Sequence, residues 1–236
     1  MSNSDYWINK EKEIVLIWSP KCACSTLHTG FVRIFLNIQI YEGETDPRKI
    51  AIKKNFIRGD YCNIPKNYSI YWGIRNPFDK IISAYINKFI LYNDKRLNET
   101  NLEPFSKNIL KKMGIVYNNL TFNKFLYGLQ DLMSKNEDID PHFSGQINLN
   151  NYNTIKNYPN LFIFDINNIP EIFGKMKVNS TPYTDNPIFK DLCDIKATEI
   201  DINNLQKKNF INSKELIKKI YSQDYQIFKK HNIIYL

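Results

Sequence analysis

The chain has 236 residues, a net charge of +8, and a hydrophobic fraction of 43%. This length and apolar content suffice for one compact core, so we expect a single domain spanning residues 1–236. Lysines and arginines are interspersed with acidic residues along the sequence. This pattern argues against a basic nucleic-acid-binding domain and favours a small anionic ligand.

The amino terminus and the cysteines indicate the environment of the protein. Residues 1–6 are polar and lead into an apolar run without the charged and apolar regions of a secretory signal or membrane anchor. The four cysteines, at positions 22, 24, 62 and 193, do not have the spacing of a disulfide framework or of a zinc site. We therefore expect a soluble, cytoplasmic protein with reduced thiols, no metal and no membrane span.

Two strand–loop–helix units open the chain. Residues 13–18 (EIVLIW) form an apolar, β-branched run typical of a buried parallel strand, and apolar residues from Leu27 to Ile38 recur at helical spacing after it. Residues 69–74 (SIYWGI) predict a second such strand. Pro77 then suits the first turn of a helix that extends to Phe89.

The rest of the chain continues the alternation of strands and helices. We expect a strand near residues 50–57, an irregular stretch over 95–105, helices at 109–113 and 122–133, a strand at 161–164, a helix near 170–175, a turn-rich stretch over 177–192 and a last helix over 213–231. This order predicts an α/β fold: a three-layer, P-loop-like domain whose mainly parallel central sheet is flanked by helices.

Each of the first two strands is followed by a loop that carries a cation. Lys21 in the first loop and Arg75 in the second stand where backbone N–H groups at a helix start favour anions. Arg75 and Ser83 have a spacing that allows both to bind one phosphate. The first loop has no glycine, unlike the G-x-x-x-x-G-K-[ST] loop of kinases, so an atypical P-loop small-molecule kinase is only an alternative. The two loops predict a ligand with an anionic group at each end.

The two loops also carry a family resemblance. Residues 20–26 (PKCACST) resemble the 5′-phosphosulfate loop of sulfotransferases, and residues 75–85 (RNPFDKIISAY) resemble their 3′-phosphate element. Residues 140–146 (DPHFSGQ) are similar to the D-x-H-W-x-P-Q segment of the carbohydrate sulfotransferases that modify chondroitin at the 4-O position or glucuronyl glycans. Residues 177–180 are similar to their H-x-N-x-S stretch and residues 220–228 to their I-Y-x-x-D-Y-x-x-F helix. The chain departs from these patterns at Phe143, Gly145 and Lys177.

This resemblance implies an enzyme that moves a sulfuryl group from 3′-phosphoadenosine 5′-phosphosulfate (PAPS) to an acceptor hydroxyl on a carbohydrate. A homologue that binds the donor without turning it over is a further alternative. Lys21 is expected to neutralise or protonate the leaving oxygen, with Ser25 and Thr26 holding the phosphosulfate and Arg75 and Ser83 the 3′-phosphate. The implied donor-binding residues are Pro20, Lys21, Cys22, Ala23, Cys24, Ser25, Thr26, Arg75 and Ser83.

An acceptor hydroxyl also requires a general base, and histidine has the most suitable ordinary pKa. The chain has three histidines. His142 lies in a segment that matches the family and is our first choice as the catalytic base. His28 is expected to pack or cap a helix, and His231 to be solvated. Carboxylates after the first helix are alternative bases, because other sulfotransferase branches use one from this region: Glu42, Glu44 and Asp60.

Overall fold

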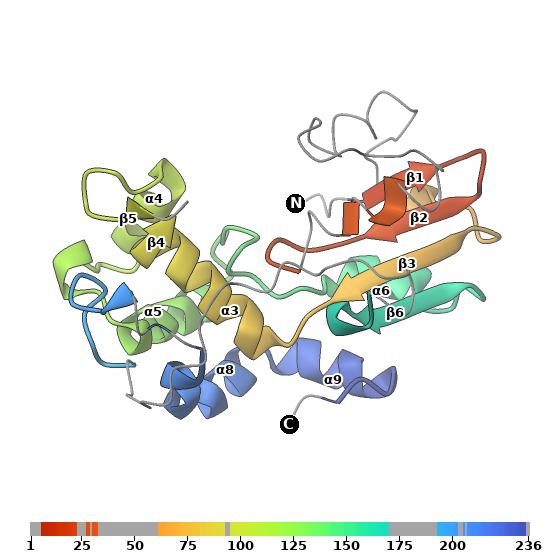
Figure 1. Cartoon of the computed structure of the whole chain (residues 1–236). Coiled ribbons are helices and arrows are strands. Elements are labelled where there is room, and N and C mark those ends of the chain that lie inside the picture. The colour runs from red at the N-terminus through yellow and green to blue at the C-terminus, as the bar shows by residue number, and fades with distance from the viewer. Residues whose placement is uncertain are drawn as a thin grey trace. The chain divides into compact units, whose positions relative to one another are not determined.

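The computed structural model describes residues 6–22, 27–28, 30–32, 61–92, 95–169, 193–202, 205 and 207–234. Of residues 207 and 208 it describes the backbone but not the side chains. The chain forms two compact units (Figure 1). The sheet unit consists of Met1–Asn76, Gln146–Asn179 and Gln226–Leu236, and the helical unit of Pro77–Gly145 and Ser180–Tyr225. None of the described helices is long and apolar enough to cross a membrane.

The described strands of the sheet unit form a sheet in the order β1-β2-β3-β6 (Figure 1). These are β1 (Tyr6–Asn9), β2 (Ile14–Ile17), β3 (Ser69–Ile74) and β6 (Leu161–Asp165). β1 is antiparallel to β2, whereas β2, β3 and β6 are parallel. The mainly parallel sheet flanked by helices confirms the predicted α/β fold, and the strands predicted at 13–18, 69–74 and 161–164 are present. β1 was not predicted, since its apolar run ends at Ile8 and is shorter than the roughly four to eight residues typical of a buried strand.

Both faces of the sheet are covered by helical segments. On one face, Trp72 of β3 belongs to an apolar cluster with Tyr152 and Ile155 of α6 (Leu149–Ile155), a helix that sequence analysis did not predict, and with Phe228 of α9 (Ser222–Lys230). On the other face, a Cβ atom at Gly73 would lie 2.8 Å from Leu27 Cδ1. Glycine therefore allows the helix after the first loop to lie directly on β3. Only residues 27–28 and 30–32 of that helix are described.

Three other predicted segments, the strand at 50–57, the helix at 170–175 and the turn-rich stretch at 177–192, lie outside the described residues.

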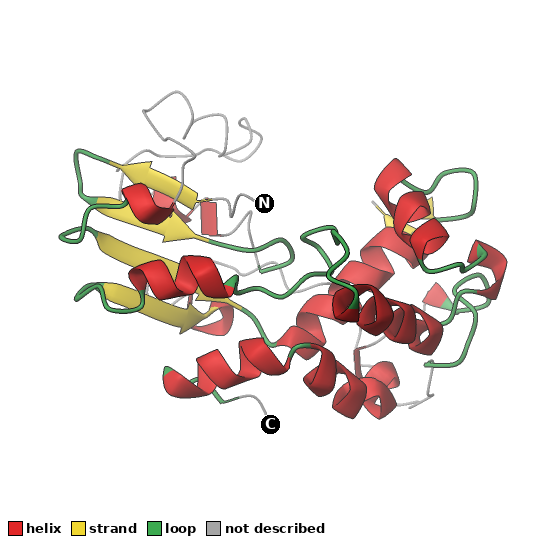
Figure 2. Ribbon diagram, turned by 180° about the vertical axis from the view of Figure 1, so that it is seen from behind, coloured by secondary structure: helices red, strands yellow, loops and turns green. Residues whose placement is uncertain are grey.

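The helical unit begins with α3 (Pro77–Tyr85), which continues into a π-helical turn (Ile86–Ile90). An antiparallel pair of short strands, β4 (Leu91–Tyr92) and β5 (Lys95–Arg96), follows, so the expectation of an irregular stretch from residue 95 is wrong at its start. α4 (Pro104–Lys112) and α5 (Phe122–Ser134) confirm the two predicted helices (Figure 1). Figure 2 shows that this unit consists mostly of helix. Short 3-10 segments, Tyr61–Asn63, Tyr117–Asn119, Ile166–Asn168 and Lys207–Ser213, complete the described elements.

Local sequence explains where α4 and α5 begin and end. Pro104 occupies the first helical position of α4, where its missing N–H costs nothing, so the helix starts earlier than predicted. At the other end Gly114 has φ +66°, and the N–H of Ile115 donates to the carbonyl of Leu110. This is the Schellman arrangement that glycine favours. The side chain of Thr121 caps α5 by accepting a hydrogen bond from the N–H of Lys124.

The prediction of one last helix over 213–231 is wrong, because the chain forms two helices there. α8 (Lys214–Ile220) ends before Tyr221, and α9 follows it. Tyr221 has φ −103° and ψ 27°, its side chain is buried, and its hydroxyl donates to the carbonyl of Phe143. This tertiary anchor interrupts a pattern that is helical on both sides.

An aromatic cluster in the core of the helical unit contains a hydroxyl that has no hydrogen-bond partner among the described residues. The ring of Tyr85 is fully buried, 4.9 Å from that of Phe122 and 5.5 Å from that of Phe125 between centroids. Burial raises the pKa of Tyr85 well above its ordinary value. Its hydroxyl has no hydrogen-bond partner in the described part of the chain. A buried hydroxyl without a partner costs about 1–3 kcal/mol of stability.

We therefore expect Tyr85→Phe to raise the free energy of unfolding by about 1 kcal/mol in urea denaturation. Tyr117→Phe is the matched control, because the Tyr117 hydroxyl contacts the carbonyl of Phe89 at 2.7 Å and that of Leu97 at 3.0 Å. The control should lower the free energy of unfolding by about 1–2 kcal/mol. Equal losses in both variants would contradict the prediction.

Candidate functional site

The first predicted loop forms a tight turn after β2. Trp18 and Ser19 are buried, and the N–H of Cys22 donates to the carbonyl of Ser19 at 3.1 Å. Within this turn Lys21 has φ +64°, in the left-handed region that favours glycine. A lysine keeps this conformation only where its surroundings hold the backbone. Pro20, Lys21 and Cys22 lie in this turn, whereas Ala23, Cys24, Ser25 and Thr26 lie outside the described residues.

The second loop meets the first at the carboxyl edge of the sheet. β2 and β3 are parallel neighbours, so the loops that follow them leave the sheet at the same edge. The guanidinium Nη1 of Arg75 donates to the carbonyl oxygen of Lys21 at 2.7 Å. This contact joins the two cation-bearing loops and helps to hold the strained backbone of Lys21. Ser83 is buried in α3 of the helical unit, and its pairing with Arg75 stays a prediction.

Gln146 contacts both loops, and sequence analysis did not select it. Its Oε1 accepts hydrogen bonds from the N–H of Arg75 and the thiol of Cys22, both at 2.8 Å, and its Nε2 donates to the carbonyl of Arg75 at 2.7 Å. Its backbone carbonyl accepts from the Ser19 hydroxyl at 3.0 Å. Gln146 is the last residue of the D-x-H-W-x-P-Q-like segment. Its place in that segment was the one feature of the sequence that could have identified it.

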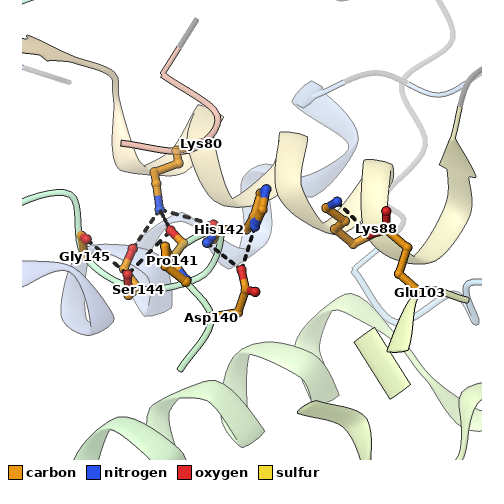
Figure 3. A network of polar contacts seen from close by, with 8 residues as sticks. All are labelled: Lys80, Lys88, Glu103, Asp140, Pro141, His142, Ser144 and Gly145. Atoms are coloured by element: carbon orange, nitrogen blue, oxygen red, sulfur yellow. Dashed lines mark hydrogen bonds and ion pairs between the residues drawn. The ribbon is translucent and has the colours of Figure 1, made fainter. Parts of the chain in front are cut away.

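The predicted base, His142, pairs with Asp140 in the helical unit (Figure 3). The ring Nδ1 of His142 lies 2.6 Å from Asp140 Oδ1, which also accepts the backbone N–H of His142 at 2.8 Å. The Phe105 ring stacks on the imidazole, with centroids 5.6 Å apart. Both members of the pair are half-buried, so the imidazole is oriented and still reaches the surface.

The charge of Asp140 determines which imidazole nitrogen can accept a proton. Burial raises the pKa of the Asp140 carboxyl, but hydrogen bonds from the ring and backbone of His142, together with the positive charges of His142 and Lys88, outweigh it, and the pKa is lowered from 3.8. The carboxylate is therefore ionised at neutral pH and can only accept. Nδ1 of the neutral imidazole must then carry the hydrogen, which leaves the lone pair on Nε2. This is the arrangement of a general base.

A buried lysine holds the segment that carries His142. Lys80 of α3 is 1% exposed, and its ammonium donates to the carbonyls of Pro141, His142 and Ser144 at 3.3, 3.2 and 2.7 Å (Figure 3). Phe143 is fully buried and stacks on Phe89, with centroids 5.7 Å apart. Phe143 stands where the family pattern has tryptophan, and it anchors the segment in the core.

The comparison with known families decides the class of this protein. The model of the sulfotransferase family matches residues 4–231. The chain belongs to the sulfotransferase family. It is therefore an enzyme of the transferase class that moves a sulfuryl group. Neither a curated protein nor a solved structure matches the chain.

The other histidines and the alternative carboxylates of this sulfotransferase have different surroundings. His28 is 3% exposed and packs against the rings of Trp7 and Trp18, at 4.1 and 4.4 Å between centroids, as expected for a packing histidine. His231 is not solvated as expected: its Nε2 lies 3.0 Å from the Tyr152 hydroxyl, and burial together with Lys230 lowers its pKa. The alternative carboxylates, Glu42, Glu44 and Asp60, lie outside the described residues.

Within the described ranges, no three His, Cys, Asp or Glu side chains are grouped so that they could hold a metal ion. Cys22, Cys62 and Cys193 are present as thiols.

Proposed function

We propose that this sulfotransferase transfers a sulfuryl group from PAPS to a carbohydrate hydroxyl, within a single functional domain spanning residues 1–236. The observation that carries the donor assignment is the hydrogen bond from Arg75 Nη1 to the Lys21 carbonyl. It brings together two loops that each carry a cation, as a ligand with two separate anionic groups requires. The family match extends through segments of both units, which supports one functional domain.

The donor loops would bind and neutralise charge. PAPS supplies a sulfuryl group attached to a phosphate leaving group. Lys21 neutralises the negative charge that develops on the leaving oxygen, and the hydroxyls of Ser25 and Thr26 hold the phosphosulfate. Arg75 and Ser83 hold the 3′-phosphate. A guanidinium has five N–H donors, so the bond from Nη1 to the Lys21 carbonyl is compatible with binding a phosphate through other donors.

His142 would remove the acceptor proton. Its Nε2 accepts the proton of the acceptor hydroxyl, while ionised Asp140 holds Nδ1–H and stabilises the imidazolium that forms. Transfer of this kind depends on positioning and charge neutralisation, so the proposal invokes no metal. The similarity of residues 140–146 to the segment of the carbohydrate sulfotransferases supports a carbohydrate acceptor.

A thermal-shift titration with 3′-phosphoadenosine 5′-phosphate (PAP), ADP and ATP tests the donor assignment. A ligand that binds only the folded protein stabilises it by about 2.7 kcal/mol at 100 times its Kd. We expect PAP to stabilise the protein at lower concentrations than ADP or ATP. A preference for ATP would support the kinase alternative, and no shift with any nucleotide would overturn the donor assignment.

Arg75→Ala is expected to weaken PAP binding by about 10- to 100-fold, the equivalent of a lost charge-assisted hydrogen bond, and to bring the affinities for PAP and ADP together. Arg96→Ala is the matched control. The Arg96 guanidinium also donates to backbone carbonyls, those of Ala197, Thr198 and Ile200, but it does not follow a strand of the parallel sheet. The control should keep the preference for PAP. Isothermal titration calorimetry on both variants measures the difference.

The acceptor assignment requires a transfer assay. We expect radiolabelled sulfuryl from PAPS to appear on members of a panel of glycans with free hydroxyls, and not on phenols or alkyl alcohols. Transfer to phenols alone would contradict a carbohydrate acceptor while preserving the sulfotransferase activity. PAP binding without transfer to any acceptor would support the alternative of a homologue that binds the donor without turning it over.

A further inference from the structure

The side chain of Gln146 is 5% exposed and makes three hydrogen bonds to the two loops. We propose that Gln146 is the positioning residue of the donor site, which sets the orientation of the Arg75 and Lys21 side chains without touching the donor. This inference rests on the proposed function. Donor recognition then depends on a loop geometry that is held by one residue, which is distant from both loops in the sequence.

At Arg75 the side-chain amide of Gln146 makes the two backbone hydrogen bonds that a neighbouring strand would otherwise make. The paired residues of β3 end at Ile74, which faces Asp165 of β6, so Arg75 lies one residue beyond the sheet. The N–H and C=O of an extended residue point to the same side, and an amide side chain can satisfy both. Gln146 bonds both groups, at 2.8 and 2.7 Å. It thereby holds the backbone from which the guanidinium extends.

At the first loop Gln146 holds both ends of the turn around Lys21. The Cys22 thiol donates to its Oε1, and the Ser19 hydroxyl donates to its backbone carbonyl. Lys21 lies between these two anchors with its backbone in the left-handed region. Arg75, itself held by Gln146, bonds the Lys21 carbonyl. The positions of both cations therefore depend on the same amide.

The chemistry of the amide yields a specific test. Oε1 must accept and Nε2 must donate, so methionine of similar length replaces neither function. An ionised glutamate could accept from the Arg75 N–H, but its second oxygen would face the Arg75 carbonyl without a hydrogen. A protonated glutamic acid would restore that donor. Gln146→Glu should therefore bind PAP better, relative to wild type, as the pH falls.

The experiment measures Kd for PAP and ADP by calorimetry in the full chain. We expect Gln146→Met to weaken PAP binding by about tenfold or more, as misplacement of the loops would. For Gln146→Glu, the ratio of its Kd to that of wild type should fall as the pH is lowered from about 8 to about 5, a range that includes the raised pKa of a buried carboxyl. Gln226→Met and Gln226→Glu are matched controls on an exposed position of α9 and should follow wild type.

The outcomes separate this inference from the proposed function. Wild-type protein with no preference for PAP over ADP would overturn the donor assignment itself. Wild type with that preference, and Gln146 variants that retain full PAP affinity, would overturn the role of Gln146. A purely structural role predicts a Gln146→Glu deficit that does not change with pH relative to wild type, and this result also overturns the inference. If the Gln146→Met variant does not fold, the pH dependence of PAP binding by the Gln146→Glu variant still tests the inference.

Discussion

Replacing His142 with alanine is expected to lower kcat for sulfuryl transfer by about 10²-fold or more and to leave the Kd for PAP unchanged. The expected loss follows from removing the Nε2 lone pair that the hydrogen bond to Asp140 makes available. Single-turnover transfer from radiolabelled PAPS to the best acceptor of the glycan panel measures it.

Two further variants test whether His142 acts with Asp140. Asp140→Asn should lower kcat by a similar order, because an amide can donate to Nδ1 and so stabilise the tautomer whose Nε2 carries the hydrogen. His231→Ala removes a histidine that contacts the Tyr152 hydroxyl in the sheet unit and should leave kcat unchanged. Full turnover in His142→Ala would exclude His142 as the base and leave Glu42, Glu44 and Asp60 as the next candidates.

Replacing Lys21 with glycine is expected to lower kcat by about 10²- to 10³-fold, the usual cost of losing one group that stabilises transition-state charge. Glycine is the informative substitution here because φ at this position is +64°. Alanine would add backbone strain to the loss of charge, whereas glycine removes the ammonium and relieves the strain. Thermal melting should therefore show unchanged or higher stability while transfer falls.

Two other substitutions at position 21 complete this test. Asparagine also adopts the left-handed backbone readily, so the Lys21→Asn variant should lose activity as the Lys21→Gly variant does. Lys21→Arg keeps a positive charge and should retain part of the rate. If the glycine and asparagine variants turned over at the wild-type rate, the ammonium would have no role in transfer. Equal losses in arginine and glycine variants would indicate that charge is not what the site requires.

Local patterns were sufficient to predict most elements and the positions of the two cation-bearing loops. Residues 13–18 and 69–74 are continuous apolar runs, each followed by a loop with a proline and a cation, and the structure forms β2 and β3 there. α4 and α5 were predicted because their apolar residues recur every three to four positions, a period set by the helix itself.

Contacts between distant residues decided what local patterns did not show. Tyr221 divides the last helix because its hydroxyl reaches Phe143, and His231 is half-buried because its ring meets Tyr152. The sequence by itself determined the fold class, the family resemblance and the two loops that carry Lys21 and Arg75, since these depend on residues close together in the chain.

Only the tertiary structure decided that Arg75 bonds the Lys21 carbonyl, and that Gln146, separated by 124 residues from Cys22 and by 71 from Arg75, holds both loops. The physical reason is that a hydrogen bond between distant segments requires only one suitable donor and one acceptor. Such a pair leaves no period in the sequence.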